Sequence, residues 1–378
     1  MKKKLLFMLS TMEIGGVEKS FLSLVSKLSP EKYDITLLLL KKKGEFLELL
    51  PKHIKVKEVH WFSKIKPILM NSPHSILKKY LKEKRIIKSL NFIGTYYLSK
   101  HTNNRLFYLK EMMKDVSCEK EEYDLAIAYP GPTEIIDYFI LEKVVAKNKI
   151  GWMHFDPTKV NMNQKLYEYM YKKFDRICVV SDEGKRKLES RFGKNRKIKV
   201  FKNIIDEDLI KELALEKITD IKIDSKTFKI ATLGRLSLEK GQDLGIMALK
   251  KLCEERLDVH WYFIGDDINR KDYEELVKKL KLENHVTFLG NKINPYPYIK
   301  MVDLYVQTSR HEGYCIALNE AKILKKTIIA TDFTGAREQI VTKKDGIICA
   351  GNEDEIFLSI KKVINEKEER KKENESQN

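Results

Sequence analysis

Short apolar segments recur along the chain, and segments with helical periodicity separate them. The apolar segments are residues 4–10, 33–40, 54–61, 123–129, 149–155, 176–181 and 198–203, and then 228–235, 259–266, 285–290, 303–309, 327–333 and 346–350. Runs of this length and β-rich composition are typical of parallel strands that are buried on both faces of a sheet. Their alternation with helical patterns, such as residues 240–257 and 271–282, predicts open, doubly wound α/β sheets.

The predicted strands fall into two sets, and a charged segment at residues 206–226 separates them. A length of 378 residues also favours two domains over one. We therefore predict two Rossmann-like doubly wound domains that face each other across a cleft, at residues 1–205 and 206–360, followed by a charged helix or tail at residues 361–378. Ligands bind beyond the carboxyl ends of the strands in such sheets, so the cleft is the expected site.

Composition narrows the class of protein. Hydrophobic residues make up 43% of the chain, which is enough for buried cores. No apolar run reaches the roughly 18 residues of a membrane-spanning helix. The N-terminal run at residues 5–9 is shorter than the roughly 7–15 residues of an export signal, so a first buried strand fits it better. The five scattered cysteines predict reduced thiols in a cytoplasmic protein, and no cluster suggests a structural metal.

The net charge of +17 predicts an anionic partner. Residues 62–114 hold twelve basic and two acidic residues, with apolar and aromatic residues between them. This pattern is typical of one or two basic amphipathic helices. Two interpretations remain open: a solvated helical hairpin, or a surface in peripheral contact with an anionic membrane. Nucleic acid is not the expected partner, because no recognition motif accompanies the charge.

A glycine pair follows the first predicted strand in the sequence TMEIGGVEKSFLSLV. Gly15 and Gly16 form a tight turn, and a helix is predicted from Val17 onward. Glycines let backbone N–H groups approach a ligand, and a helix N-terminus favours anions. The GxGxxG dinucleotide spacing is absent, so a plain strand-to-helix turn remains the alternative.

Two cations flank the loop GRLSLEKGQDL, which follows the first strand of the second predicted domain. Arg235 can hold two phosphate oxygens, while Lys240 acts as a point charge. Gly241 leaves room where the next helix begins. The two cations suit a diphosphate, and ordinary surface charges are the alternative.

Two glutamates frame a glycine in the sequence SRHEGYCIALNEA. Glu312 precedes a predicted helix and Glu320 lies inside it, while Gly313 permits an unusual backbone angle and residues 314–317 offer free N–H groups. Eight residues of continuous helix would separate the carboxylates by about 12 Å along the axis. We therefore expect them to accept hydrogen bonds from hydroxyl groups on different parts of one ligand. Charges that stabilise the helix N-terminus are the alternative.

The predicted strand at residues 149–155 ends in His154. A histidine at the carboxyl end of a strand could donate a proton or orient a substrate, although a lone histidine is more often structural. Asp156 either holds His154 or starts the turn before Pro157.

As a set, these motifs resemble those of retaining glycosyltransferases of family 4, which have the two-Rossmann GT-B fold. The resemblance covers nearly the whole chain and is densest over residues 234–243 and 309–339, where Glu312 and Glu320 match the family's E-x7-E motif. The sequences EGYC and ATDFTGAREQI are similar to those of transferases that build bacterial capsule and other cell-surface polysaccharides.

The resemblance implies the substrates. A nucleotide sugar would be the donor, with uridine as the base expected for the family. A glycan or a lipid-linked saccharide would be the acceptor, and no metal or other cofactor would be required. A nucleotide-sugar 2-epimerase of the same fold and a non-catalytic scaffold that binds nucleotide sugar remain alternatives.

The resemblance also implies a role for each matching residue. Arg235 and Lys240 would bind the diphosphate, Glu320 the ribose, and Glu312 the transferred sugar. The implied catalytic set is Glu312, His154, Arg235 and Lys240, and the remaining donor-binding residues are Gly15, Gly16, Gly313, Tyr314, Cys315, Ile316 and Glu320.

Two positions depart from the family pattern. Many members have glycine where this chain has Cys315 and Lys325. Glycine is favoured at the second position because it caps the end of a helix, so this helix is expected to end in another way.

Overall fold

The computed structural model describes residues 2–224, 226–342 and 345–376. The chain divides into two compact units, unit 1 and unit 2, with the main boundary between Lys202 and Asn203, and the short segment Ile14–Gly16 is grouped with unit 2. That boundary and the one expected after residue 205 lie in the same loop, between β7 (Ile198–Val200) and α9 (Glu207–Leu213).

The described residues of unit 1 form one parallel sheet of seven strands in the order β3-β2-β1-β4-β5-β6-β7. The strands are β1 (Lys3–Leu9), β2 (Tyr33–Leu39), β3 (Lys55–Glu58), β4 (Glu122–Ala128), β5 (Val145–Met153), β6 (Arg176–Val179) and β7. The strand order reverses between β1 and β4, which is the arrangement of a Rossmann-like doubly wound sheet. The helices that connect the strands include α1 (Gly16–Ser26), α6 (Glu134–Lys143), α7 (Gln164–Lys173) and α8 (Asp182–Phe192), and a short 3-10 turn lies at Glu45–Leu47.

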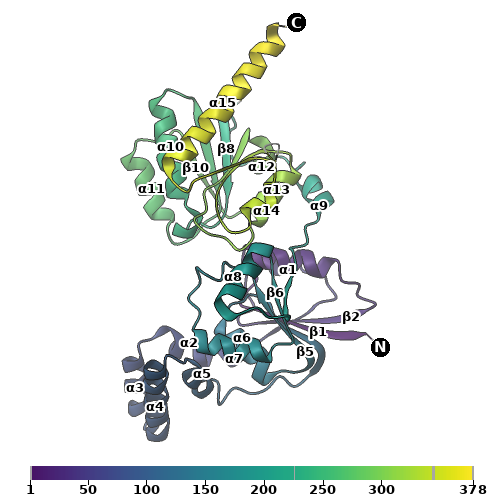
Figure 1. Cartoon of the computed structure of the whole chain (residues 1–378), viewed down its shortest axis with the longest axis vertical. Helices are drawn as coiled ribbons and strands as arrows, with labels where there is room; N and C mark the ends of the chain where they lie inside the picture. Colours follow the sequence, from purple (N-terminus) through teal and green to yellow (C-terminus); the bar gives the residue numbers. More distant parts are fainter. Residues whose placement is uncertain (1, 225, 343–344, 377–378) are drawn as a thin grey trace. The chain divides into compact units, whose positions relative to one another are not determined.

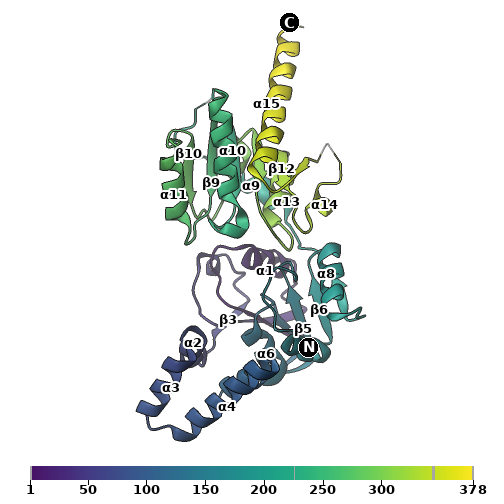
Figure 2. The ribbon, with the colours of Figure 1, turned by 60° about the vertical axis from the view of Figure 1, so that its left-hand side comes forward.

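The basic segment at residues 62–114 contains more helices than the sequence predicted. The structure has α2 (Phe62–Met70), α3 (Pro73–Lys82), α4 (Ile86–Thr102) and α5 (Leu106–Met112), where one or two helices were expected. Ser72 caps α3 with Pro73 at its first position, and Asn103 ends α4 in a left-handed conformation. These local signals divide an otherwise continuous amphipathic pattern. Figures 1 and 2 show α3 and α4 side by side as a hairpin.

The described part of unit 2 has a parallel sheet of six strands in the order β10-β9-β8-β11-β12-β13. Its strands are β8 (Phe228–Leu233), β9 (Val259–Ile264), β10 (Val286–Gly290), β11 (Leu304–Gln307), β12 (Thr327–Thr331) and β13 (Ile347–Cys349). Successive residues of one strand enter opposite cores: Ile230 packs in one cluster and Ala231 in the other. This explains the unbroken apolar runs of the sequence, since both faces of the sheet are buried. All thirteen predicted strands are present.

Helices cover both faces of the unit 2 sheet. They are α9, α10 (Gln242–Glu254), α11 (Arg270–Lys279), α12 (Tyr296–Met301), α13 (Ile316–Ile323), α14 (Ala336–Gln339) and α15 (Glu353–Ser376), with a 3-10 turn at Leu238–Lys240. The last helix begins before the tail predicted from residue 361. Ile356, Ile360 and Ile364 of α15 are buried in one core, so the first half of this helix is part of unit 2 (Figure 2).

The end of α13 corrects one prediction. Lys325 has a φ of 54°, so a lysine adopts the left-handed conformation that glycine usually supplies. Its N–H donates to the carbonyl of Lys322 at 2.9 Å, and the N–H of Lys326 donates to the carbonyl of Ala321 at 3.0 Å. The helix therefore ends in the usual Schellman geometry, not in another way. Lys84, Arg256 and Lys281 have the same backbone conformation, with φ of 56°, 63° and 59°.

We expect Lys281→Gly, at the end of α11, to raise the free energy of unfolding by up to about 1 kcal/mol. The left-handed conformation costs a non-glycine residue roughly 1–2 kcal/mol, and the greater backbone freedom of unfolded glycine offsets part of the gain. Lys278→Gly is the matched control, because Lys278 lies inside the same helix and glycine there should destabilise by about 1 kcal/mol. Urea unfolding measures both changes, and equal losses in the two variants would contradict the prediction.

Candidate functional site

The sequence-predicted residues of unit 2 meet where its strand order reverses. β8 and β11 are neighbours in the sheet although two strands separate them in the sequence. The segment after β8 carries Arg235 and Lys240, and the segment after β11 carries Glu312. In open α/β sheets this reversal point is where ligands bind.

A buried ion pair joins the two segments. Lys240 Nζ lies 2.6 Å from Glu312 Oε1, and the two side chains are 18% and 11% exposed. Burial opposes the charged form of Lys240, but the charge of Glu312 and its hydrogen bond outweigh burial, so the pKa of Lys240 is raised. Lys240 is therefore charged near neutral pH, and the two side chains hold each other in place.

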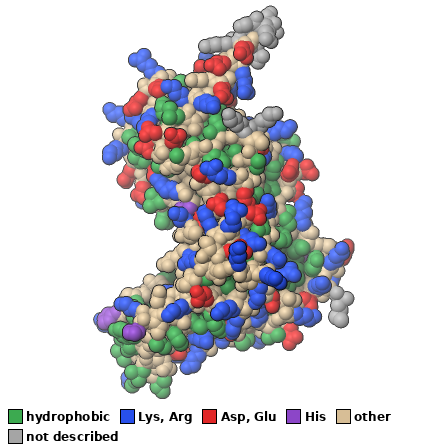
Figure 3. Space-filling view, viewed as in Figure 1, with side chains coloured by type: hydrophobic (Ala, Val, Ile, Leu, Met, Phe, Trp, Pro, Cys, Tyr) green, Lys and Arg blue, Asp and Glu red, His purple; other side chains and the backbone are tan. Residues whose placement is uncertain are grey.

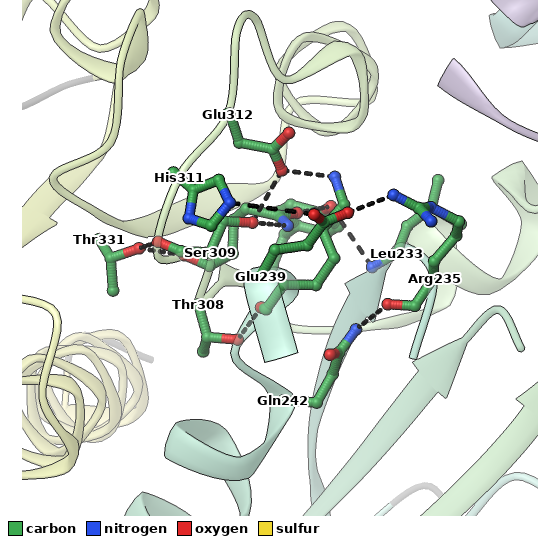
Figure 4. Close-up of polar contacts among 12 residues, drawn as sticks. Leu233, Arg235, Glu239, Gln242, Thr308, Ser309, His311, Glu312 and Thr331 are labelled. Carbon is green, nitrogen blue, oxygen red and sulfur yellow. Dashed lines mark hydrogen bonds and ion pairs between the residues drawn. The ribbon is translucent and has the colours of Figure 1, made fainter. Parts of the chain in front are cut away.

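A chain of buried hydrogen bonds orients Glu312 (Figure 4). Ser309 Oγ donates to Glu312 Oε1 at 2.8 Å, and Gln307 Nε2 donates to Ser309 Oγ at 2.8 Å. Tyr305 OH in turn donates to Gln307 Oε1 at 2.6 Å. Burial raises the pKa of Tyr305, so its hydroxyl stays a donor. These hydrogen bonds connect the Glu312 carboxylate to side chains of β11 and so hold it in one orientation.

Contacts to the backbone lock the two segments together. Thr308 Oγ1 donates to the carbonyl of Lys240 at 3.0 Å, and the N–H of Arg310 donates to the carbonyl of Glu239 at 2.8 Å. Gly241 has a φ of 65°, and a Cβ built on it would lie 2.2 Å from the carbonyl oxygen of Thr308. Only glycine combines this conformation with so close an approach, so the room predicted at Gly241 is taken up by the backbone of the neighbouring segment.

Arg235 differs from Lys240 in its surroundings. Its guanidinium pairs with Asp267 Oδ2 at 3.3 Å and with Glu239, and its side chain is 49% exposed. Such exposed pairs contribute little to stability and rearrange readily. Gln242 Nε2 donates to the carbonyl of Arg235 at 2.7 Å and fixes the backbone below it. Arg235 is thus an exposed cation at the edge of the site, while Lys240 is a mostly buried cation inside it.

Glu320 is almost completely buried, with 1% exposure. It lies on α13, and Tyr296 OH donates to its Oε1 at 3.1 Å. Burial and the charge of Glu320 together raise the pKa of Tyr296, which keeps that hydroxyl protonated. Glu312 precedes the helix and is not part of it, so the two glutamates belong to different structural elements, as the sequence predicted.

The start of α13 carries no side-chain cap among the described residues. The helix begins at Ile316 with Cys315 at the N-cap position, and Gly313 and Tyr314 lead into it. Cys315 is buried, and burial raises the pKa of its thiol. A helix N-terminus without a side-chain cap leaves backbone N–H groups available for an anion.

The remaining candidate residues lie after β1 and β5, two strands of the unit 1 sheet. Gly15 and Gly16 lie between β1 and α1, and α1 begins at Gly16, one residue earlier than predicted. His154 follows β5 and is buried against the rings of Tyr129 and Trp152. Its Nε2 atom has no hydrogen-bond partner among the described residues. Burial lowers the pKa of His154 to about 3, so it is neutral near pH 7.

Asp156 starts a turn after His154. Its Oδ1 accepts hydrogen bonds from the N–H and the hydroxyl of Thr158, at 2.8 and 2.7 Å, and its Oδ2 pairs with Lys187 at 2.9 Å. These contacts are those of the turn that the sequence offered as one of two interpretations.

The sequence did not lead us to predict the hydrogen-bonded side chains that orient Glu312. Gln307, Thr308 and Ser309 are completely or almost completely buried at the end of β11. Three consecutive polar residues at the end of an apolar strand could have indicated these contacts, because buried polar groups need hydrogen-bond partners. His311 also lies in this segment, with its Nε2 atom 3.9 Å from a carboxylate oxygen of Glu239. Nothing in the sequence pattern predicted this contact. No group of three or more His, Cys, Asp or Glu within the described ranges could hold a metal ion.

Sequence comparison finds glycosyltransferases among the similar proteins. Residues 215–377 match the family model described as glycosyl transferases group 1. An uncharacterised glycosyltransferase of Methanocaldococcus jannaschii is 32% identical over 232 residues, which is 57% of this chain and 57% of the relative. The N-acetylgalactosamine-N,N'-diacetylbacillosaminyl-diphospho-undecaprenol 4-alpha-N-acetylgalactosaminyltransferase of Campylobacter jejuni is 29% identical over 213 residues, 56% of each chain. The chain thus spans just over half the length of these relatives, and the matches support a glycosyltransferase.

Structural comparison shows the fold. The crystal structure of HepE from Anabaena in complex with UDP-glucose has a TM-score of 0.67 and 19% identity, and covers 97% of this chain and 91% of that chain. WaaG, a glycosyltransferase of lipopolysaccharide biosynthesis, has a TM-score of 0.59 and 14% identity, over 96% of this chain and 90% of that chain. Together with the two doubly wound sheets, these likenesses confirm the predicted GT-B fold.

We expect His154→Phe to make the protein less sensitive to acid. As the pH falls below about 6.5, the unfolded chain binds a proton at this position while the folded chain does not, so the wild type loses stability until the pH approaches 3. The phenylalanine variant lacks this loss, which amounts to about 1.4 kcal/mol per pH unit. The measurement is the free energy of unfolding in urea at pH 7 and at pH 4.5, where the two proteins should diverge by about 2–3 kcal/mol.

His74→Phe is the control, because His74 is exposed on α3. Burial raises the pKa of Asp137 to about 7, so protonation of this carboxyl stabilises the folded state as the pH falls. Asp137 is present in every variant, so its contribution cancels in the comparison. An unchanged acid dependence in His154→Phe would show that the buried imidazole is not the source.

Proposed function

We propose that the protein is a retaining glycosyltransferase that moves a hexosyl group from a nucleotide sugar to a glycan or lipid-linked saccharide in cell-surface polysaccharide synthesis. A UDP-sugar is the favoured donor, in keeping with the UDP-glucose held by the structurally similar HepE. The observation that carries the proposal is the buried pairing of Lys240 with Glu312 beside the uncapped start of α13. One fixed cation, one fixed carboxylate and a helix N-terminus suit a diphosphate joined to a sugar.

The proposed chemistry needs no metal. Negative charge grows on the departing nucleoside diphosphate, and Lys240, Arg235 and the N-terminus of α13 would stabilise it. To take part, Arg235 would exchange its partners Glu239 and Asp267 for phosphate oxygens, which its exposure permits. The backbone from Tyr314 to Ile316 would supply the N–H donors.

Glu312 would bind the transferred sugar near its reacting carbon, where the transition state resembles an oxocarbenium ion. The hydrogen-bond chain through Ser309 gives the carboxylate a fixed orientation before the donor arrives. Gly15, Gly16 and His154 keep the donor-side roles that the family resemblance implies. Because His154 is neutral near pH 7, we propose that it orients a sugar hydroxyl through a hydrogen bond and does not act as a cationic acid.

Glu320 is proposed to bind the ribose. Its burial requires that the ribose hydroxyls reach a carboxylate already oriented by Tyr296. Desolvated carboxylates make strong hydrogen bonds to hydroxyl donors, so a single buried glutamate could account for much of the affinity for the nucleoside.

The helical hairpin α3–α4 is proposed to rest on an anionic membrane at the inner face of the cell. Ile86, Ile87 and Leu90 are 63%, 76% and 64% exposed. Lysines and arginines surround them, and Figure 3 shows hydrophobic and basic side chains intermixed over this part of unit 1. No described helix is long and apolar enough to cross a membrane. Exposed apolar groups among cations suit a surface contact with anionic lipids.

We expect one class of nucleotide sugar to stabilise the protein against heat. The panel is UDP-, GDP-, ADP- and dTDP-sugars without acceptor, and a donor at 100 times its Kd adds about 2.7 kcal/mol to the folded state. Glu320→Gln should weaken the response to that class, because the amide keeps an acceptor for Tyr296 but loses the charge. No response to any donor by the folded protein would contradict the proposed function.

Glu275→Gln is the matched control for this experiment. Glu275 is exposed on α11, so the same chemical change there should leave the donor response intact. An equal response in wild type and Glu320→Gln would remove Glu320 from the donor site while leaving the transferase proposal in place.

We expect charge reversal on the hairpin to abolish binding to vesicles that contain phosphatidylglycerol. Each lysine near an anionic surface contributes about 1 kcal/mol, so replacing four with glutamate should weaken binding at least a hundredfold in a sedimentation assay. The substituted residues are Lys78, Lys79, Lys82 and Lys84. The control reverses four exposed lysines on and after α11, namely Lys271, Lys278, Lys279 and Lys281. Unchanged binding in the first variant would rule out the hairpin as the membrane contact.

A further inference from the structure

A cavity lies among the four helices that follow β3 in unit 1. Its volume is about 610 Å³, and α2, α3, α4 and the residues at the end of α5 supply its walls. Pockets that hold small molecules in proteins span roughly 300–1,000 Å³. The cavity is therefore large enough for a ligand, and it is separate from every residue placed at the donor site.

The inner part of the cavity is apolar. Trp61, Ile65, Ile76 and Phe92 line it, and each of these side chains is at most 8% exposed. Tyr80 adds a partly buried ring that packs edge-on against Phe92, with 5.9 Å between ring centroids. A lining of this kind accepts hydrocarbon, because burial of apolar surface is favourable.

The outer part of the cavity is charged, with an excess of cations. Lys64, Lys79, Arg85 and Lys88 line it, together with Glu83, Glu111 and Asp115. Arg85 and Lys79 share one carboxylate, Glu83, at 3.3 and 4.0 Å, and Lys88 pairs with Asp115. The third acid, Glu111, lies 4.0 Å from Lys114, which is a further cation outside the lining. No ion pair of Lys64 occurs among the described residues, so positive charge remains for an anion.

Trp61 supplies an independent sign of a ligand. Its side chain is 8% exposed, and its Nε1 atom has no hydrogen-bond partner within the part of the chain that the structure describes. An indole N–H can only donate, and buried donors are nearly always paired. The Nε1 atom itself is not exposed to the cavity, so the sign is an unpaired buried donor on a side chain that also lines the cavity.

We propose that this cavity binds an aliphatic phosphate, with the hydrocarbon among Trp61, Ile76 and Phe92 and the phosphate at Lys64, Lys79 and Arg85. A phosphate monoester carries about −1.5 to −2 charges and three acceptor oxygens, which suits Lys64 together with Lys79 and Arg85, the two cations that share one carboxylate. The shared chemistry fits both a prenyl phosphate and the phosphate end of a phospholipid. The inference depends on unit 1 alone and stands whether or not the protein transfers sugar.

The test is calorimetric titration of the full chain with farnesyl monophosphate below its micelle concentration. We expect binding to the wild type, a loss of at least tenfold in Lys64→Ala/Lys79→Ala, and a loss of about fivefold in Trp61→Phe. Lys64 and Lys79 are exposed, so the double variant keeps the test valid if Trp61→Phe folds poorly.

Matched controls exist for both variants. Trp152→Phe makes the same change at another buried tryptophan of unit 1 whose N–H lacks a partner among the described residues. Lys66→Ala/Lys100→Ala removes two lysines from α2 and α4 that do not line the cavity. Both controls should stay within twofold of the wild type.

The ligand panel separates the possible sources. Tighter binding of farnesyl phosphate than of dihexanoyl phosphatidic acid supports a prenyl phosphate, and the reverse supports a phospholipid. The proposal is overturned if the wild type does not bind, if farnesol binds equally well, or if inorganic phosphate displaces the ligand at similar concentration. It is also overturned if Ile87→Ser abolishes binding while the cavity variants do not, since the exposed surface would then be the site.

Discussion

The candidate site of unit 2 depends on one buried ion pair, Lys240 with Glu312. Removing two charges from water is costly, and the loss is recovered only where geometry and further hydrogen bonds are good. Here the carboxylate also accepts from Ser309, and the backbone of Lys240 is held by Thr308. The pair therefore does more than neutralise two charges: it fixes the loops after β8 and β11 against each other where the strand order reverses.

The two cations of the site have different physical tasks. Lys240 is held in place and cannot move far without leaving Glu312 unpaired, whereas Arg235 lies at the surface with partners that it can exchange. A fixed charge suits the part of a ligand that reacts, because it is already oriented when negative charge develops. An exposed guanidinium suits the binding of a phosphate that arrives from solvent.

Unit 1 combines a regular sheet with a helical part of different character. The α2–α5 helices expose apolar side chains, among them Ile86, Ile87 and Leu90, and they line a cavity with charged residues at its rim. The net charge of +17 is thus not spread as a uniform solvated surface. Helix ends at Ser72 and Asn103 divide the basic segment into separate helices. The arrangement of these helices creates both the exposed apolar surface and the cavity.

The sequence by itself determined the two sheets, because unbroken apolar runs separated by helical patterns have few other solutions. It also identified Arg235, Lys240, Glu312 and Glu320 as candidates. Only the tertiary structure decided which of them touch: Glu312 pairs with a residue 72 positions away, while Glu320 turns to Tyr296. Spacing along a helix could not reveal this, since the partners belong to other elements: Lys240 to the 3-10 turn after β8, and Tyr296 to α12. The left-handed Lys325 was equally hidden, because hydrogen bonds of the helix end overrode the preference of the residue.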